Sequence, residues 1–253
     1  MPRYKLVIEY DGTPFVGWQS QANGRGVQDT IEAAVHRFSG ETRRIQCAGR
    51  TDTGVHATGQ VAHLDLAKAW GTDTVRDALN AHLKPDPVSI LSAQIVPDHF
   101  NARTSATKRH YSYLILNRRA PPALDRLRAW HVPWALDAGL MNDAASLLVG
   151  RHDFTTFRSS DCQANSPLRT LDVFSVARDG EEIRVSASAR SFLHHQVRSM
   201  VGTIALAGGG RWSVEEVGRA LDAKSRAACG PLAPPHGLTF VGVEYGQPDR
   251  SEA

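Results

Sequence analysis

The sequence predicts an α+β protein in which two subdomains share one sheet. Segments with alternating apolar residues and segments with apolar residues at helical spacing occur in similar proportion in both halves of the chain. No internal repeat relates the two halves. The length of 253 residues fits one large domain or two small ones and is enough to bury a core without metal or disulfide support.

The first half begins with a predicted strand, because apolar residues alternate from Tyr4 to Tyr10. Val27, Ile31 and Val35 then fall at helical spacing and predict a helix that ends before Gly40. The other elements expected here are strands at 43–48, 60–66, 88–96 and 107–117 and a helix at 73–83. The Ala-Pro-Pro-Ala stretch at 120–123 breaks the pattern, and we expect an N-terminal subdomain at 1–106 and a C-terminal one at 107–253.

The second half repeats this mixture. Strands at 170–177 and 182–189 are expected to form a hairpin that turns at Asp179-Gly180, and a final strand is expected at 238–245. Helices are predicted at 136–149, 192–207 and 213–223. Ser213 is a candidate N-cap of the last helix, with Glu216 as its capping-box partner.

Composition excludes several classes of protein. Hydrophobic residues make up 42% and charged residues 22% of the chain, which excludes wholesale disorder. The mean hydropathy is −0.31, and the most apolar stretch, near 200–207, is far shorter than a membrane span. The chain runs from Met1 directly into a predicted strand, without the pattern of a signal peptide. We therefore expect a soluble, cytoplasmic protein with no membrane partner.

Cysteine usage and charge add two further limits. Cys47, Cys162 and Cys229 are far apart, so a disulfide framework or a thiolate zinc site is not expected, and the thiols should be buried or neutral. The net charge of +3 and the pI near 8.9 are compatible with a polyanionic partner but do not prove one.

The segment at 49–60 is the most informative part of the sequence. Between two predicted strands it contains three glycines, Arg50, Asp52 and His56. Catalytic groups often lie on loops that rigid strands hold in place. Composition alone nevertheless favours a plain turn in which Asp52 caps backbone N–H groups.

A resemblance to a known family favours the catalytic interpretation of this segment over the plain turn. Residues 49–60 resemble the signature of the TruA family, the tRNA pseudouridine synthase A group, and four further segments resemble family motifs in the same order. These segments are 10–21 (Tyr-Asp-Gly-Thr with Phe-x-Gly-Trp-Gln-x-Gln), 100–113 (Phe-Asn-Ala-Arg-Thr-Ser-Ala with Tyr-x-Tyr), 153–158 and 192–202. Thr53 and Asn101 differ from the residues common in the family, yet neither change removes a chemical group that the reaction needs.

The resemblance implies isomerisation of uridine to pseudouridine in the anticodon stem-loop of tRNA, at positions 38, 39 and 40. The reaction neither oxidises nor hydrolyses, so no cofactor is expected, and the sequence has no GxxxxGK, HExxH or GxGxxG motif. The implied fold is a central, largely antiparallel sheet flanked by helices, with a cleft between two RRM-like subdomains. The family is dimeric, so we expect a homodimer with tRNA contacting both chains.

The resemblance also assigns roles to single residues. Asp52 is the expected catalytic carboxylate, which attacks C1′, adds to C6 or removes the C2′ proton. Arg198 is its expected partner, and Arg50 is expected to hold the RNA around the extruded nucleotide. Tyr111 matches the tyrosine that packs on the target base, and Leu238 matches a leucine of the base pocket.

Two segments are expected to contact tRNA more widely. They are Phe100, Asn101, Ala102, Arg103 and Thr104, and Asp161, Cys162, Gln163, Ala164 and Asn165. From Arg103 to Arg128 the chain also has seven basic residues and one acid, interleaved with Tyr111 and Tyr113. We expect this basic run (Arg103, Lys108, Arg109, Arg118, Arg119, Arg126 and Arg128) to line a groove that faces phosphates.

Other interpretations are less consistent with the sequence. The histidines lack a matching set of carboxylates, so no metal site is expected at His56, His63 or His194-His195. A noncatalytic RNA-binding protein with RRM-like halves would gain nothing from an acid such as Asp52 in a phosphate groove. A glycosidase needs two positioned carboxylates where 49–60 offers one, and a DxDxT phosphatase needs an aspartate where Gly54 stands.

Overall fold

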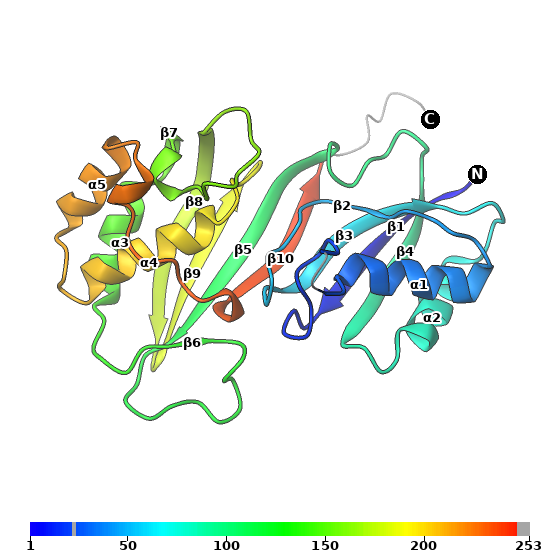
Figure 1. The fold of residues 1–253 in the computed structure, drawn as a ribbon, viewed down its shortest axis with the longest axis horizontal. Helices are drawn as coiled ribbons and strands as arrows, with labels where there is room; N and C mark the ends of the chain where they lie inside the picture. Colours follow the sequence, from blue (N-terminus) through cyan, green and yellow to red (C-terminus); the bar gives the residue numbers. More distant parts are fainter. Residues whose placement is uncertain (22–23, 247–253) are drawn as a thin grey trace. The chain divides into compact units, whose positions relative to one another are not determined.

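The chain divides into two units, with boundaries between Arg109 and His110 and between Thr239 and Phe240 (Figure 1). This computed structural model describes residues 1–21 and 24–246. The first unit contains Met1–Arg109 and the residues from Phe240 onward, and the second contains His110–Thr239. The last strand, expected in the C-terminal subdomain, therefore starts in the second unit and continues in the first.

The strands of the first unit are neighbours in one sheet. Their order is β4 (Val88–Val96), β1 (Arg3–Tyr10), β3 (His56–Asp65) and β10 (Leu238–Tyr245), and β2 (Gln46–Cys47) pairs with β3. β1 is antiparallel to both β3 and β4, and β2 is antiparallel to β3. The strand expected at 43–48 is thus reduced to two residues, and β3 begins four residues earlier than expected.

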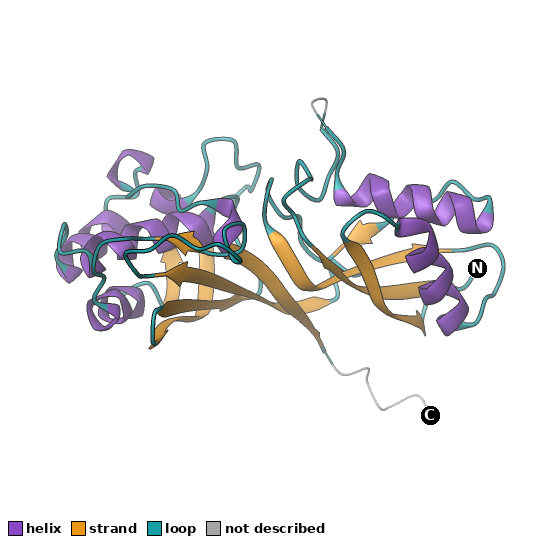
Figure 2. Ribbon diagram, turned by 90° about the horizontal axis from the view of Figure 1, so that it is seen from below, coloured by secondary structure: helices purple, strands orange, loops and turns teal. Residues whose placement is uncertain are grey.

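Two helices complete the core of this unit. α1 (Val27–Ser39) lies along one face of the strands (Figure 2), and α2 (Thr72–Leu83) packs against α1 and β4. The alternation in β1 buries Tyr4, Leu6 and Ile8 completely, together with Ile31 of α1. Apolar periodicity therefore correctly predicts which side of β1 and α1 is covered.

The remaining strands lie in the second unit, except that the first of them begins within the first unit, at Ala106. The order is β5 (Ala106–Leu116), β9 (Glu182–Ala189), β8 (Leu168–Asp179) and β7 (Gly150–Asp153), and β6 (Trp130–His131) pairs with β5 in parallel. β8 and β9 form the predicted hairpin, with Asp179 opposite Glu182. β6 and β7 are short and were not predicted from the sequence.

Three α-helices belong to the second unit: α3 (Ala138–Ser146), α4 (Gln196–Gly208) and α5 (Val214–Asp222). α5 has the predicted capping box, in which Ser213 Oγ accepts from Glu216 N and the Glu216 carboxylate accepts from Ser213 N. Short 3-10 helices η1 (Thr155–Phe157), η2 (Arg226–Ala228) and η3 (Pro235–Gly237) connect the other elements. Both units combine strands and helices, which confirms the α+β class.

α4 begins four residues later than its apolar pattern suggests. His195 has a φ of 65°, in the left-handed region, so regular helix cannot continue upstream of it. The Gln196 side chain accepts a hydrogen bond from Leu193 N at 2.8 Å and stabilises the turn that precedes the helix. Within the described residues, no helix has the length and apolar character needed to cross a membrane.

Candidate active site

Asp52 lies in a tight turn that connects β2 to β3. Val55 N donates to Asp52 O at 3.2 Å, and Gly54 has a φ of 75°, which favours glycine. The Asp52 side chain is half-buried, and the neighbouring Arg50 is exposed. A turn is therefore present at this position, as composition favours, and the carboxylate that the resemblance singles out lies in it.

The segment after β1 holds this turn from one side. Trp18 N donates to Thr51 O at 3.0 Å, and the Tyr10 hydroxyl lies 2.8 Å from Thr51 Oγ1 in a buried hydrogen bond. A Cβ atom on Gly17, which has a φ of 106°, would lie 2.7 Å from Thr51 O. The two segments thus approach each other closely on both sides of Thr51, one residue before Asp52.

Gly12 brings the same segment against the end of the turn. A Cβ atom at this position would lie 2.0 Å from Val55 O, so only glycine fits. Gly12 N also donates to His56 Nδ1 at 3.1 Å. This accounts physically for the glycine of the Tyr-Asp-Gly-Thr motif at the end of β1.

Gln60 fixes the start of the turn from within β3. Its side chain is wholly buried, and Nε2 donates to Gly49 O at 2.7 Å. Gly49 in turn packs on the ring of Phe240, since a Cβ atom there would lie 3.4 Å from the ring. Both ends of the segment that carries Asp52 are thus attached to the sheet of the first unit.

The predicted RNA-binding residues 100–104 form a turn around Asn101. Asn101 Oδ1 accepts hydrogen bonds from Arg103 N at 2.9 Å and Thr104 N at 3.1 Å, an arrangement typical of Asx turns. Arg103 and Thr104 are exposed, and Phe100 packs on the ring of Tyr245 with 5.0 Å between centroids. The turn therefore presents the Arg103 guanidinium and the Thr104 hydroxyl at the surface.

Ala102 supports this turn from the interior. It is completely buried; its N–H donates to His63 Nδ1 at 3.1 Å, and its carbonyl accepts from the Tyr245 hydroxyl at 2.9 Å. Burial and the nearby Arg3 guanidinium lower the pKa of His63. Because Nδ1 must remain unprotonated to accept from Ala102, this lowered pKa is consistent with the structural role of the ring.

In the second unit Arg198 is almost fully buried on α4. Its Nε donates to Ala233 O at 2.9 Å, while Arg198 O accepts from Ala233 N at 3.2 Å. One turn later a Cβ atom on Gly202 would lie 1.8 Å from Pro231 O, so this glycine permits the close approach of the 230–234 segment. The Arg198 guanidinium is thus held through Nε by the backbone of this segment.

Aromatic residues position Tyr111 and Leu238 in the same unit. Tyr111 is half-buried and meets Phe192 edge-on, with 5.2 Å between ring centroids. The Tyr113 hydroxyl donates to Pro234 O at 2.8 Å, and its ring packs on Gly237. Gly237 directly precedes Leu238, which is buried at the start of β10.

The second predicted RNA-binding segment, 161–165, is a surface turn after η1. Asp161, Gln163 and Asn165 are exposed, and Cys162 is half-buried. Ser159 anchors the turn through three hydrogen bonds: its N–H donates to His194 O, its hydroxyl accepts from Asp161 N, and its carbonyl accepts from Cys162 N.

The three cysteines, Cys47, Cys162 and Cys229, are free thiols, and burial raises the pKa of Cys47 to about 12.

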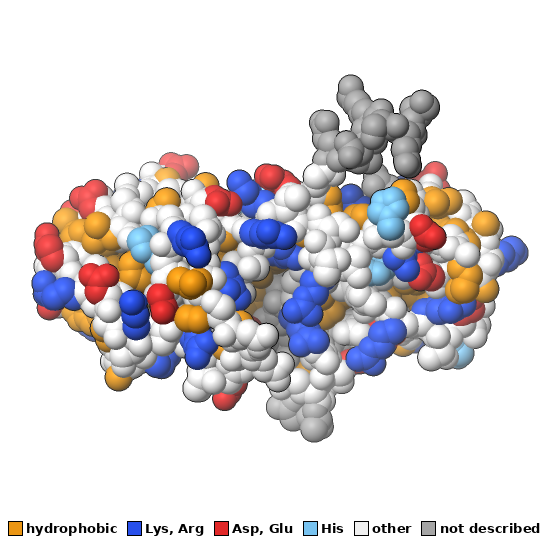
Figure 3. Space-filling model, turned by 90° about the horizontal axis from the view of Figure 1, so that it is seen from above, with side chains coloured by type: hydrophobic (Ala, Val, Ile, Leu, Met, Phe, Trp, Pro, Cys, Tyr) orange, Lys and Arg blue, Asp and Glu red, His pale blue; other side chains and the backbone are white. Residues whose placement is uncertain are grey.

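The basic run needs one correction. Arg109 does not face solvent: its side chain is buried, and its guanidinium donates to backbone carbonyls within the first unit. Arg119, Arg126 and Arg128 of the second unit are exposed, as is Arg103 of the first. Lys and Arg side chains are visible on both units in Figure 3, with Asp and Glu among them.

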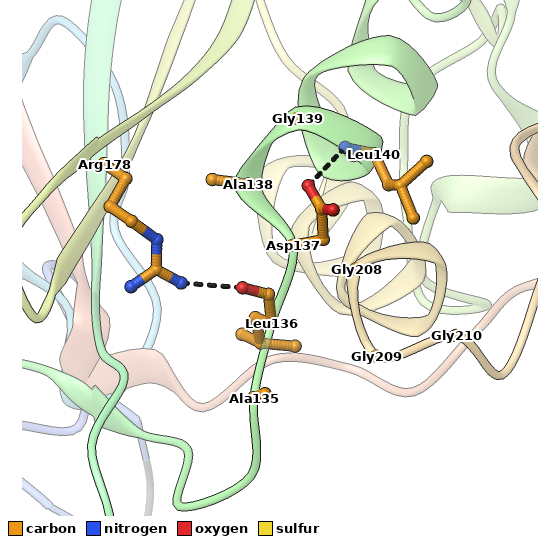
Figure 4. A pocket seen from close by; sticks show the side chains of 10 residues that line it. All are labelled: Ala135, Leu136, Asp137, Ala138, Gly139, Leu140, Arg178, Gly208, Gly209 and Gly210. Carbon is orange, nitrogen blue, oxygen red and sulfur yellow. Dashed lines mark hydrogen bonds between the residues drawn. The ribbon is translucent and has the colours of Figure 1, made fainter.

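The second unit also has a surface hollow of about 670 Å³, away from the predicted site residues (Figure 4). It lies at the start of α3 and the end of α4. Its polar groups serve the fold, since Arg178 donates to Leu136 O at 2.7 Å and Asp137 Oδ1 caps α3 by accepting from Leu140 N at 3.0 Å. None of the predicted site residues lines it.

Four polar residues support the site in ways that the sequence did not indicate. Gln60 and His63 on β3 and Arg109 on β5 hold backbone of the two predicted functional turns. His56, also on β3, accepts from Gly12 N and so holds the segment after β1 against the Asp52 turn. His56 and Gln60 lie within the signature segment, so a polar side chain on a buried strand was the available signal. For His63 and Arg109 the signal was weaker, because their partners are distant in sequence.

Comparison with known proteins agrees with the motif resemblance. Residues 6–104 and 144–246 match the family of tRNA pseudouridine synthases, and these ranges include Asp52 and Arg198. The tRNA pseudouridine synthase A of Methylobacterium radiotolerans is 66% identical over 249 residues, which cover 97% of this chain and 98% of that protein. Those of Methylobacterium sp. strain 4-46 and Xanthobacter autotrophicus are 62% and 59% identical, over 98% and 97% of this chain and 99% and 100% of their own lengths.

These matches extend over nearly the whole chain and confirm the resemblance drawn from five short motifs. They also confirm the pseudouridine synthase fold expected from it. The chain belongs to the tRNA pseudouridine synthase family.

Proposed function

We propose that this chain isomerises uridine to pseudouridine in tRNA, at positions 38, 39 and 40 of the anticodon stem-loop, with Asp52 as the catalytic residue. The observation that carries the proposal is the family match, which spans the segments of both Asp52 and Arg198. A matching relative at 66% identity over nearly the full chain favours an isomerase over a noncatalytic RNA-binding protein.

The chemistry is an intramolecular transfer. The bond from N1 of uracil to C1′ of ribose breaks, the bound base rotates, and C5 forms a new bond to C1′. C5 loses its proton and N1 gains one, so the balance requires no oxidant, reductant or water. We therefore propose that the enzyme works without a cofactor.

Asp52 is suited to this chemistry by the way its turn is held. Hydrogen bonds at Gly49 and Thr51 and close contacts at Gly12 and Gly17 fix the backbone on both sides of the carboxylate. A fixed carboxylate loses little freedom when a nucleotide arrives. The proposal leaves open whether Asp52 attacks C1′, adds to C6 or removes the C2′ proton.

The second unit supplies the proposed partners. Arg198 is the guanidinium that keeps Asp52 ionised next to the base, since an adjacent cation favours a carboxylate. Tyr111 stacks on the extruded uracil, and stacking contributes about 1–3 kcal/mol per base against an unstacking cost of a few kcal/mol. Arg50 holds the RNA around the flipped nucleotide, and Leu238 borders the base.

Three exposed surfaces are proposed to bind the rest of the stem-loop. They are the turn at 100–104 apart from Ala102, whose burial excludes it from the predicted RNA contacts, the turn at 161–165, and the loop after β5 that carries Arg119, Arg126 and Arg128. Their cations suit phosphates, while their amides and hydroxyls suit sugar and base edges. We further propose that two copies of the chain act as a homodimer in the cytoplasm; light scattering of the purified protein, alone and with tRNA, tests the oligomer.

Position specificity is tested with stem-loop transcripts that have uridine at only one of positions 38, 39 and 40. We expect pseudouridine in all three transcripts, and none when all three positions carry cytidine and other stem-loop uridines remain. Product at those other uridines, or at none of the three positions, would contradict the proposed specificity. Full-length tRNA with the same substitutions controls for contacts outside the stem-loop.

A further inference from the structure

Arg109 holds two separate segments of the first unit with one guanidinium. It lies on β5 with 8% of its surface exposed. Nε and Nη2 donate to Ala48 O at 3.1 and 2.8 Å, and Nη2 also donates to Arg103 O at 2.6 Å. Ala106 O is a weaker acceptor, at 3.5 Å from Nη1.

The two main acceptors belong to different predicted functional elements. Ala48 directly precedes Gly49, where the turn that carries Asp52 begins, and its N–H is bonded to Val61 O of β3. Arg103 is one of the exposed residues of the predicted RNA-binding turn. The guanidinium therefore bridges the backbone of the turn proposed to bind RNA and the backbone that leads to the proposed catalytic residue.

Arginine is specifically suited to this position. Its planar fork presents several N–H donors in fixed directions, whereas a lysine ammonium is a compact point charge on a flexible stem. A lysine at 109 would keep the charge but could not reproduce the paired donation to Ala48 together with the bond to Arg103. Side-chain geometry, and not charge alone, is what the position requires.

We infer that Arg109 is a positioning residue that couples the RNA-binding turn at 100–104 to the catalytic turn at 49–55. This inference rests on the proposed function. RNA bound to Arg103 and Thr104 would hold the Arg103 carbonyl in place. The Arg109 guanidinium, which donates to this carbonyl and to Ala48 O, would then fix the start of the Asp52 turn. Loss of the Arg109 guanidinium should therefore slow the chemical step more than it weakens RNA binding.

The test compares R109K and R109Q with a matched control. Arg37 on α1 also donates to a backbone carbonyl, His82 O at 2.6 Å, but it is exposed and contacts neither turn. R37K and R37Q therefore report the general effect of removing such a bond. Each variant is examined for thermal unfolding, for tRNA affinity, and for the single-turnover rate of tritium release from tRNA that contains [5-³H]uridine.

We expect R109K and R109Q to fold, to bind tRNA within about threefold of the native protein, and to release tritium at least tenfold more slowly. R37K and R37Q should match the native protein in all three measurements. Folded Arg109 variants with native rates, or with affinity reduced as much as rate, would overturn the coupling. Failure of both Arg109 variants to fold would also overturn it, because the residue would then support the whole unit.

The controls separate this inference from the proposed function. If the native protein and the Arg37 variants release no tritium, the proposed function fails whatever Arg109 does. If they release tritium at the same rate as the Arg109 variants, the proposed function stands and only the coupling is overturned.

Discussion

Replacing Gly12 with alanine should displace the turn that carries Asp52. The added methyl would lie 2.0 Å from Val55 O and 2.6 Å from Val55 C, and both are backbone atoms. Contacts of this kind below 3.0 Å are essentially never seen, so the two segments must separate by about 1 Å or more. The hydrogen bond from Gly12 N to His56 Nδ1, now 3.1 Å, would lengthen with them.

The expected cost has two parts. Forcing a methyl group into a well-packed site costs about 1–3 kcal/mol of folding free energy. A displacement of about 1 Å near the reacting atoms can lower a rate by about 10²-fold. We therefore expect G12A to remain folded, with a lower unfolding midpoint in urea and a single-turnover rate of tritium release reduced by one to two orders of magnitude.

Gly242 provides the matched control for this change. It lies on β10 in the same unit, and a Cβ atom there meets nothing within 4 Å. G242A should keep native stability and rate. A G12A protein that is as stable and as fast as G242A would refute the account of a tightly held catalytic turn.

Three further predictions concern His63, Arg198 and the exposed arginines of the loop after β5. The pKa of His63 is lowered in the folded protein, so the unfolded chain binds more protons; stability should fall as pH drops below about 6.5, and H63Q should show a smaller difference between urea midpoints at pH 7 and pH 5. R198M should reduce turnover far more than tRNA affinity; the reverse result would exclude the proposed pairing with Asp52. Affinity for tRNA should decrease steeply with salt, and replacing Arg119, Arg126 and Arg128 with glutamine should flatten that dependence; a slope that the triple variant leaves unchanged would exclude these residues from phosphate binding.

Local patterns predict local structure well in this chain. β1, α1, α2 and the β8–β9 hairpin lie where periodicity places them, and the Ser213 cap forms as expected. Deviations occur where local geometry overrides periodicity. His195 in the left-handed region delays the start of α4, and a two-residue β2 replaces a longer predicted strand.

Contacts between distant segments could not be predicted in the same way. Nothing in residues 240–245 indicates that they pair beside β3, about 180 residues earlier in the chain. The sequence places Arg109 in a basic run because charge is visible in sequence, whereas its carbonyl acceptors, 61 and 6 residues away, are not. The family motifs assign expected roles to Asp52 and Arg198, but they do not indicate which side chains hold the backbone of the Asp52 turn.

The central claim is that Asp52 is the catalytic residue of a uridine isomerase, and tritium release from tRNA transcribed with [5-³H]uridine tests it most directly. C5 must lose its hydrogen when it bonds to C1′, so release reports the isomerisation itself. The native protein should release tritium, and D52A should release none while it binds tRNA with native affinity. Release by D52A at the native rate, or no release by a native protein that binds tRNA, would contradict the claim.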